Sequence, residues 1–150
     1  VFLYKLLRMQ TVSMTQEFNA PVEEIFNYLS DHNNFGALLK ANIKRIKDSN
    51  SSDVNGLDSV RSIGIGPLTI LEETIITFDK PHLIEYQISN NVPVNYHIGR
   101  LEFTKLGENK CSLHYTIDIE TKFSLADGLI LFAIKSTIAS GLSKLAKRYQ

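Results

Sequence analysis

The sequence predicts one α+β domain, in which a curved antiparallel sheet of seven strands wraps round a long C-terminal helix. Three observations lead to this prediction. The chain has 150 residues and is 43% hydrophobic, which suits one domain with a real core. Segments with strand periodicity follow one another in series, separated by short turn signals. The one long helical pattern comes last, and such segregation of strands and helices is typical of an α+β fold.

The regular structure is expected to begin with a strand and two short helices. Polar and apolar residues alternate over Met9–Phe18, which predicts a strand. An amphipathic helix is expected over Pro21–Leu29, with Pro21 at the first helical position, where its missing N–H costs nothing. Asp31 is suited to cap a second short helix that carries Phe35.

Six further strands are predicted after these helices. Each break between them is short, so consecutive strands should pair antiparallel. The polar run Ser49–Asn55 is expected to be a loop. The predicted strands are Asn42–Lys47, Ser59–Ile65, Leu68–Phe78, Leu83–Ser89, Tyr96–Lys105 and Ser112–Glu120.

The last segment has the period of a helix. Ser124 and Asp127 resemble a capping box, and apolar residues then recur at three- and four-residue steps as far as Tyr149. This predicts a helix of about 25 residues, roughly 37 Å long. Its first half, Leu129–Ile134, is apolar nearly all round, so we expect it to be covered on several sides, with the concave face of the sheet on one flank.

The composition limits the classes of partner. Acidic and basic residues number 16 each, so no global basic field attracts nucleic acid or an anionic membrane. The single cysteine, Cys111, excludes an intramolecular disulfide and a multi-cysteine zinc site, and we expect it to be buried. This favours a reducing, cytoplasmic location. Residues 1–8 are too short to span a bilayer and do not resemble a signal peptide; they are interpreted as an N-terminal extension or an early strand.

Four stretches of the chain carry a family resemblance. They lie at the first helix, at the third strand, at the fourth and fifth strands, and at the sixth strand. The stretches read Ala20-Pro21-x-Glu23-x-Ile25-Phe26-x-x-Leu29-x-Asp31, Gly56-x-x-x-Val60-Arg61, Glu73-x-Ile75-x-x-Phe78-Asp79-Lys80-Pro81-x-x-Ile84-x-Tyr86 and Gly99-x-Leu101-x-Phe103.

From about Met9 to Tyr149 the sequence resembles the START/SRPBCC superfamily, which includes birch-pollen-allergen-like and polyketide cyclase/dehydrase-like proteins. The resemblance implies a helix-grip fold with an internal cavity for lipids, polyketides, sterols, quinones or plant-hormone-like molecules. None of the four stretches is a catalytic signature, so the resemblance chooses no single function. The family often has a tryptophan near its second helix; this chain has none, and Phe35 is expected to take that place.

The candidate ligand-binding residues are those expected on the concave face of the sheet and on the facing side of the long helix. Most are apolar, and a few polar groups among them would orient a ligand. Tyr86 and Tyr115 are either such ligand contacts or core residues whose hydroxyl groups reach the rim or a water. The set is Arg61, Ile63, Glu73, Ile75, Tyr86, Ile88, His97, Leu101, Tyr115, Ile117, Leu129, Phe132 and Ala133.

Histidines supply one candidate for acid–base chemistry. His97 is expected to face inward and has a pKa suited to proton transfer near neutrality, although a lone histidine on a strand is often structural. His114 is expected on the outer face, while His32 and His82 fall at a helix start and a strand start. The four histidines have no metal-ligand spacing, so we predict no metal, and no cofactor is implied.

Arg61 and Glu73 are the most specific polar pair. A tight hairpin would put Arg61 opposite about Leu71, with Glu73 as its diagonal neighbour on a buried face. A buried charge needs a partner, so the two are expected to pair. The pair would form either a polar clamp for a ligand's carboxylate, hydroxyl or carbonyl group, or a structural ion pair. The opposite register, with Ser62 and Glu72 inward, is the alternative.

Three functions remain open at this stage. The first is binding or carriage of a hydrophobic small molecule or lipid. The second is a polyketide cyclase/dehydratase-like enzyme, with His97, Tyr86, Arg61 and Glu73 as catalytic candidates that would have to converge on one volume. The third is a protein-interaction module, which predicts a filled core and an exposed apolar patch. Basic residues at 144, 147 and 148 complement the helix dipole or make transient contact with anionic headgroups.

Overall fold

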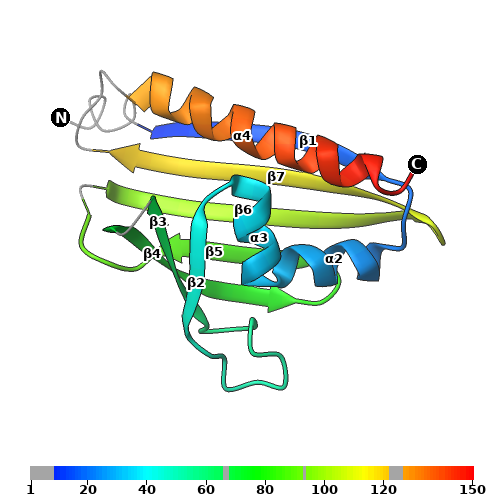
Figure 1. Ribbon diagram of the computed structural model, residues 1–150, viewed down its shortest axis with the longest axis horizontal. Coiled ribbons are helices and arrows are strands. Elements are labelled where there is room, and N and C mark those ends of the chain that lie inside the picture. The colour runs from blue at the N-terminus through cyan, green and yellow to red at the C-terminus, as the bar shows by residue number, and fades with distance from the viewer. Residues whose placement is uncertain (1–8, 66–67, 93, 122–126) are drawn as a thin grey trace.

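The computed structural model describes residues 9–65, 68–92, 94–121 and 127–150 (Figure 1). Over these residues it confirms the α+β prediction: a seven-stranded antiparallel sheet carries three helices in a helix-grip arrangement. The predicted cap at Ser124 lies outside the described residues. Among the described residues, no helix has the length and hydrophobicity needed to cross a membrane.

The sheet follows chain order except at one edge. Its strand order is β1-β7-β6-β5-β4-β3-β2, so the first strand of the chain pairs with the last. Every described pairing of neighbouring strands is antiparallel, including that of β1 with β7. Short turns join β4 to β5 and β6 to β7, while a longer loop over residues 48–59 joins β2 to β3. The strand ends differ from those predicted by one or two residues at most. The strands are β1 Met9–Phe18, β2 Asn42–Lys47, β3 Val60–Ile65, β4 Leu68–Asp79, β5 Leu83–Ile88, β6 Val94–Gly107 and β7 Lys110–Thr121.

The two short helices, α2 (Val22–Ser30) and α3 (His32–Leu39), connect β1 to β2. Asp31 caps α3 as predicted, because its carboxylate accepts hydrogen bonds from two backbone N–H groups in the first turn. Pro21 differs from the prediction. With φ −58° and ψ 144° it precedes the helix as the N-cap residue and is not its first helical residue.

The long helix, α4 (Asp127–Lys147), runs beside β1 and also packs on α3 (Figure 1). It ends before the predicted Tyr149 because the N–H groups of Arg148 and Tyr149 bond three residues back, as in a tight turn. Its buried stripe passes through Leu131, Ile138, Leu142 and Leu145.

The expectation that the first half of α4 is covered on several sides is wrong for its described side chains. Phe132 is 70% exposed and Ile134 is 36% exposed, while Leu131 is buried. The reason is the position of the helix. α4 packs against β1 and α3, so its opposite side faces solvent.

A close approach between α3 and α4 depends on one glycine. A Cβ atom at Gly141 would lie 2.5 Å from the carbonyl oxygen of Leu38 and 2.8 Å from its Cγ atom. The first of these atoms is backbone and cannot rotate away. Gly141 therefore sets the distance between the two helices.

We predict that Gly141→Ala destabilises the protein. Alanine favours an isolated helix by about 1 kcal/mol over glycine, but overpacking at a rigid contact costs about 1–3 kcal/mol. Because the clash is with a backbone atom, the upper part of that range, about 2–3 kcal/mol, applies, so the net loss of stability expected in urea unfolding is about 1–2 kcal/mol. Gly107→Ala is the control, since a Cβ atom there would be in ordinary contact with Lys110, whose Cβ atom lies 3.9 Å away. An unchanged or raised unfolding midpoint for Gly141→Ala would contradict this account of the α3–α4 contact.

Candidate functional site

A cavity of about 330 Å³ lies between the inner face of the sheet, α3 and the first half of α4. Its wall is mostly apolar, with a few polar side chains, chiefly from β4, β5, β6 and β7. This is the composition expected of a site for a small organic molecule. The residues that line it are Phe35, Leu39, Ala41, Ile63, Leu71, Glu73, Tyr86, Ile88, His97, Tyr115, Ile117, Ile119, Leu131, Ala133, Ile134, Thr137 and Ile138.

Eight of the candidate residues lie in this wall. They come from five strands and α4, which the fold brings round one volume, and their contact with a ligand stays a prediction. The eight are Ile63, Glu73, Tyr86, Ile88, His97, Tyr115, Ile117 and Ala133.

The other candidates lie elsewhere. Arg61, Ile75 and Leu101 are buried behind the wall and do not line the cavity. Phe132 was expected to face the cavity and instead faces solvent. It follows Leu131 by one residue, or about 100° round the helix, so the two cannot share the buried stripe. The side chain of Leu129 lies outside the described residues.

Arg61 and Glu73 form a buried ion pair. The Arg61 Nε donates to the Glu73 Oε2 over 2.8 Å, and Nη2 lies 2.7 Å from the same oxygen. The two side chains are only 4% and 7% exposed. At this burial a charge needs its partner, so the pair fixes both residues in one ionised arrangement.

The register that produces this pair differs from the prediction. Arg61 is directly opposite Glu73, not opposite about Leu71 with Glu73 on the diagonal. A β-bulge in β4 accounts for one of the two residues of this difference; the unbulged hairpin, with Ile65 opposite Leu68, would already put Arg61 opposite Glu72. Ile63 pairs with Leu71 while Gly64 pairs with Thr69, so the partner strand carries one extra residue. That residue shifts the register and keeps Arg61 and Glu73 on one buried face.

Aromatic rings hold the guanidinium group of Arg61 from two sides. Its Cζ atom lies 4.2 Å from the ring centre of Phe35 and 4.6 Å from that of Tyr86. Arginine stacks well between such rings because its charge is delocalised and weakly hydrated. Phe35, which stands where the family resemblance suggested a tryptophan, therefore shields the ion pair.

His32 completes the polar cluster, although no pattern in the sequence indicated that it would. Its Nδ1 lies 3.4 Å from Nη1 of Arg61, and its Nε2 lies 3.1 Å from Oγ of Ser59. A guanidinium only donates, so Nδ1 accepts and the proton is assigned to Nε2, which donates to Ser59. Burial, and then the charges of Arg61 and Arg45, lower the pKa of His32 to about 3, which keeps the ring neutral.

Two tyrosines form part of the cavity wall. The hydroxyl groups of Tyr86 and Tyr115 are hydrogen-bonded to each other. Burial raises the pKa of both phenols, so they stay protonated, and the hydroxyl that accepts from the other keeps its own proton free to donate. The ring of Tyr86 lies over Gly99 on the neighbouring strand, where any Cβ atom would overlap the ring.

His97 lies next to these tyrosines, with its ring centre 5.6 Å from that of Tyr86. Its Nδ1 accepts a hydrogen bond from the Ile88 N–H over 3.2 Å, so the proton of the neutral ring is assigned to Nε2. Burial lowers the pKa of His97. Glu73, Tyr86, His97 and Tyr115 thus converge on one cavity, which offers hydroxyl and N–H donors beside a carboxylate.

Two further expectations are confirmed outside the cavity. His114 is exposed and hydrogen-bonded to Ser13, which places it on the outer face of the sheet. Cys111 is buried, and burial raises the pKa of its thiol to about 11. Since the thiolate is the reactive form, this cysteine is not poised as a nucleophile.

Comparisons with known proteins agree with this architecture. The family model described as "Polyketide cyclase / dehydrase and lipid transport" matches residues 9–150. A search of curated proteins gives no significant match.

Solved structures share the fold at low sequence identity. A norcoclaurine synthase mutant from Thalictrum flavum, in complex with a transition-state analogue, is 17% identical with a TM-score of 0.70, over 93% of this chain and 95% of that one. A START superfamily protein from Mycobacterium smegmatis is 15% identical with a TM-score of 0.72, over 93% and 99%. A protein from Thermobifida fusca is 19% identical with a TM-score of 0.70, over 93% and 92%. At these identities the likeness shows the fold alone.

We predict that Arg61→Met destabilises the protein by about 3–5 kcal/mol, because it leaves the Glu73 carboxylate buried without its partner. Arg100→Met is the matched control. Arg100 also lies 2.7 Å from a glutamate, Glu85, but its side chain is 43% exposed. Loss of an exposed pair costs less than about 1 kcal/mol. Urea unfolding should show a larger loss of stability for Arg61→Met than for Arg100→Met. Equal losses of stability would show that burial does not make the Arg61–Glu73 pair more important than the exposed pair.

The lowered pKa of His32 predicts a pH dependence of stability. The unfolded chain takes up a proton on this ring near pH 6.5, whereas the folded protein does so only near pH 3. The stabilisation is therefore complete above about pH 6.5 and is lost as the pH falls toward 3, by at most about 1.4 kcal/mol per pH unit.

His32→Gln should reduce the slope of this pH profile, because glutamine does not titrate; the slope that remains is expected from His97, whose pKa burial also lowers. His114→Gln, on the exposed face, is the control and should leave the profile unchanged. The free energy of unfolding at pH 7 and at pH 5 gives the comparison. A wild-type slope that persists in His32→Gln would assign the pH dependence to other groups.

Proposed function

Because the chain belongs to the polyketide cyclase/dehydrase and lipid transport family, we propose that it binds and carries a hydrophobic small molecule or lipid in the cavity between its sheet and α4. The observation that carries the proposal is the cavity itself, about 330 Å³ with a mostly apolar wall. That volume is at the lower end of the range for small-molecule sites. A cytoplasmic location is proposed with it, on the evidence of a single, buried cysteine.

The polar part of the wall favours a neutral ligand that carries a hydroxyl group. Glu73 lines the cavity, but its partner Arg61 does not, so the charged group presented to a ligand is a carboxylate. A ligand carboxylate would meet a like charge in a site of low polarity, which costs several kcal/mol. A hydroxyl can instead donate to Glu73 and accept from His97 or a tyrosine. The cavity is therefore matched to an amphiphile with an alcohol or phenol at one end.

A second candidate function, catalysis of the polyketide cyclase/dehydratase kind, is favoured by one observation. Glu73, Tyr86, His97 and Tyr115 share one cavity, as such an enzyme would require. The Glu73 carboxylate would take up a proton, while the Nε2–H of His97 or a tyrosine hydroxyl would donate to a carbonyl oxygen. Incubation with a linear poly-β-ketone would test this. An enzyme should turn the substrate over faster than the uncatalysed rate, and Tyr86→Phe and His97→Gln should lower that turnover. A rate equal to the uncatalysed rate would exclude this enzyme activity and would leave ligand carriage as the proposed function.

The interaction-module alternative predicted a filled core. The cavity weighs against it, although Phe132 and Ile134 do expose apolar surface on α4.

We predict that the cavity prefers an alcohol to the carboxylate of the same chain length. Nile red, a neutral dye, would be bound first and then displaced by 1-dodecanol or by dodecanoate at pH 8. The alcohol should bind at least about tenfold more tightly, since the carboxylate is repelled by Glu73. Glu73→Gln should reduce or reverse this preference, because it leaves the positive charge of Arg61 uncompensated.

A mouth-blocking variant separates binding in the cavity from binding at the surface. Ala133 lines the cavity and is also exposed, so Ala133→Trp can narrow the entrance without overfilling the core. Lys135→Trp, exposed on the same helix and outside the cavity wall, is the control. Dye binding should fall in Ala133→Trp and persist in Lys135→Trp. Failure of wild-type protein to bind the dye or either dodecyl probe would overturn the proposed function.

A further inference from the structure

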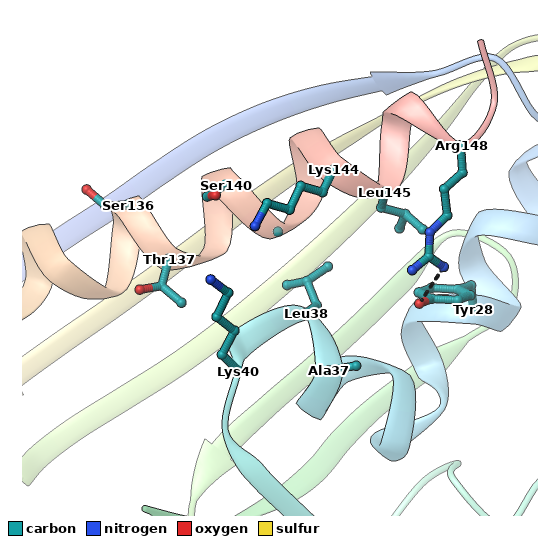
Figure 2. A pocket seen from close by; sticks show the side chains of 11 residues that line it. Tyr28, Ala37, Leu38, Lys40, Ser136, Thr137, Ser140, Lys144, Leu145 and Arg148 are labelled. Atoms are coloured by element: carbon teal, nitrogen blue, oxygen red, sulfur yellow. Dashed lines mark hydrogen bonds between the residues drawn. The ribbon is translucent and has the colours of Figure 1, made fainter.

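A second hollow lies on the other side of the α3–α4 contact. It is a groove of about 320 Å³ between α2 and α3 on one side and α4 on the other. Figure 2 shows Lys40, at the end of α3, pointing toward α4, and Lys144 and Arg148 projecting from α4 and the turn that follows it. Hydroxyl groups of Thr137 and Ser140 lie in the same wall, while Leu38 and Leu145 supply apolar surface. Nothing in the proposed cavity function uses this groove.

The groove concentrates positive charge in a chain whose net charge is zero. Lys40, Lys144 and Arg148 line it, and no acidic residue does. Within the described residues, none of these three cations forms an ion pair. Arg148 donates one hydrogen bond, from Nη1 to the Tyr28 hydroxyl over 3.2 Å, and so has donors to spare.

The dipoles of the two helices offset only part of the positive charge in the groove. Lys144 lies in the last turn of α4 and Lys40 directly follows α3, so both complement the negative ends of helices. Each helix end carries about half an elementary negative charge. Two such ends offset about one of the three positive charges, which leaves about two unbalanced.

The backbone at Lys40 supplies an independent observation. This residue has φ 52° and ψ 36°, the left-handed conformation that ends α3. Glycine or asparagine is the usual residue there, since a larger side chain costs about 1–2 kcal/mol. A lysine occupies this position in spite of that cost, and its side chain points across the groove toward α4 (Figure 2).

The side chains along α4 repeat at the spacing of one helical face. Ser136, Ser140 and Lys144 recur every four residues, and Thr137 begins the adjoining row that ends near Arg148. Ammonium, guanidinium and hydroxyl donors on one face suit an anion with several oxygen atoms. Gly141 holds this face at a fixed distance from α3, so the donors from both helices stay on one site.

We propose that this groove is a binding site for a phosphate group, presented either by a small phosphorylated molecule or by a lipid headgroup. Three cations and two or more hydroxyl groups would share the phosphate oxygens, and the apolar floor would accept a small organic part. The site is separate from the apolar cavity, although Thr137 lines both. It stands whether or not the cavity carries a ligand.

The test titrates the protein with inorganic phosphate at constant ionic strength and follows the backbone amide signals of Gly141 and Thr137 by NMR. Saturable shifts are expected in the wild type. Lys40→Asn and Lys144→Gln should each weaken binding by about tenfold, the effect of losing one charged hydrogen bond. Asparagine tolerates the left-handed conformation, so Lys40→Asn should keep or raise the stability of the protein.

Lys147→Gln is the matched control, because it removes the same charge from the same last turn of α4 but does not line the groove. Its phosphate affinity should stay within about twofold of wild type, since the loss of a screened charge outside the site is a small effect. Equal weakening in Lys147→Gln would indicate general electrostatic attraction and would overturn the proposal. So would the absence of saturable shifts in the wild type.

Vesicles then distinguish the two sources of the phosphate. Sedimentation is compared for vesicles of phosphatidylcholine alone and for vesicles that also contain phosphatidic acid. Binding to the second kind that is lost in Lys40→Asn and Lys144→Gln, and kept in Lys147→Gln, assigns a lipid headgroup. Saturable phosphate binding without such vesicle binding assigns a small phosphorylated ligand.

Discussion

The buried pair of Arg61 and Glu73 is the interaction on which the rest of the site depends. Two ions removed from water need each other, and they hold the bulged register of β3 against β4. The guanidinium then fixes the rings on either side of it, Phe35 from α3 and Tyr86 from β5. His32, hydrogen-bonded to the same guanidinium, ties the start of α3 to β3. The Arg61 side chain thus holds α3, three strands of the sheet and one wall of the cavity in position.

The same pair sets the chemistry of the cavity. Arg61 neutralises Glu73 from behind the wall, so only the carboxylate reaches the space where a ligand would lie. The neighbouring groups are neutral, because burial raises the pKa of both tyrosines and lowers that of His97. The result is a short polar strip in an apolar wall, with donors and one acceptor but no accessible cation among the described lining residues. Stability and ligand preference therefore rest on the same few side chains, and a substitution that alters one alters the other.

The sequence was sufficient for features set by local periodicity and for one pairing that follows from them, that of Arg61 with Glu73. Alternation by two and by three to four residues gave every strand and helix to within a few residues, and Asp31 was recognised as a cap because capping is local. The bulge in β4 was missed because one extra residue leaves the alternation on either side intact. Phe132 was misplaced because periodicity does not tell which side of a uniformly apolar helix meets its neighbours. His32 entered the site through contacts with residues 27 and 29 positions away, which no local pattern reports.

The position of α4 connects the two hollows of the molecule. The helix has the apolar cavity on one side and the cationic groove on another, and Thr137 lines both. Its distance from α3 is set by the contact of Gly141 with the backbone of Leu38, where no flexible side chain can absorb a displacement. Packed interiors transmit such strain because they are dense and have few voids. A ligand large enough to push α4 away from the sheet would therefore also change the spacing of Lys40 and Lys144 across the groove. The contact between Gly141 and Leu38 is thus the one through which the two sites would be coupled.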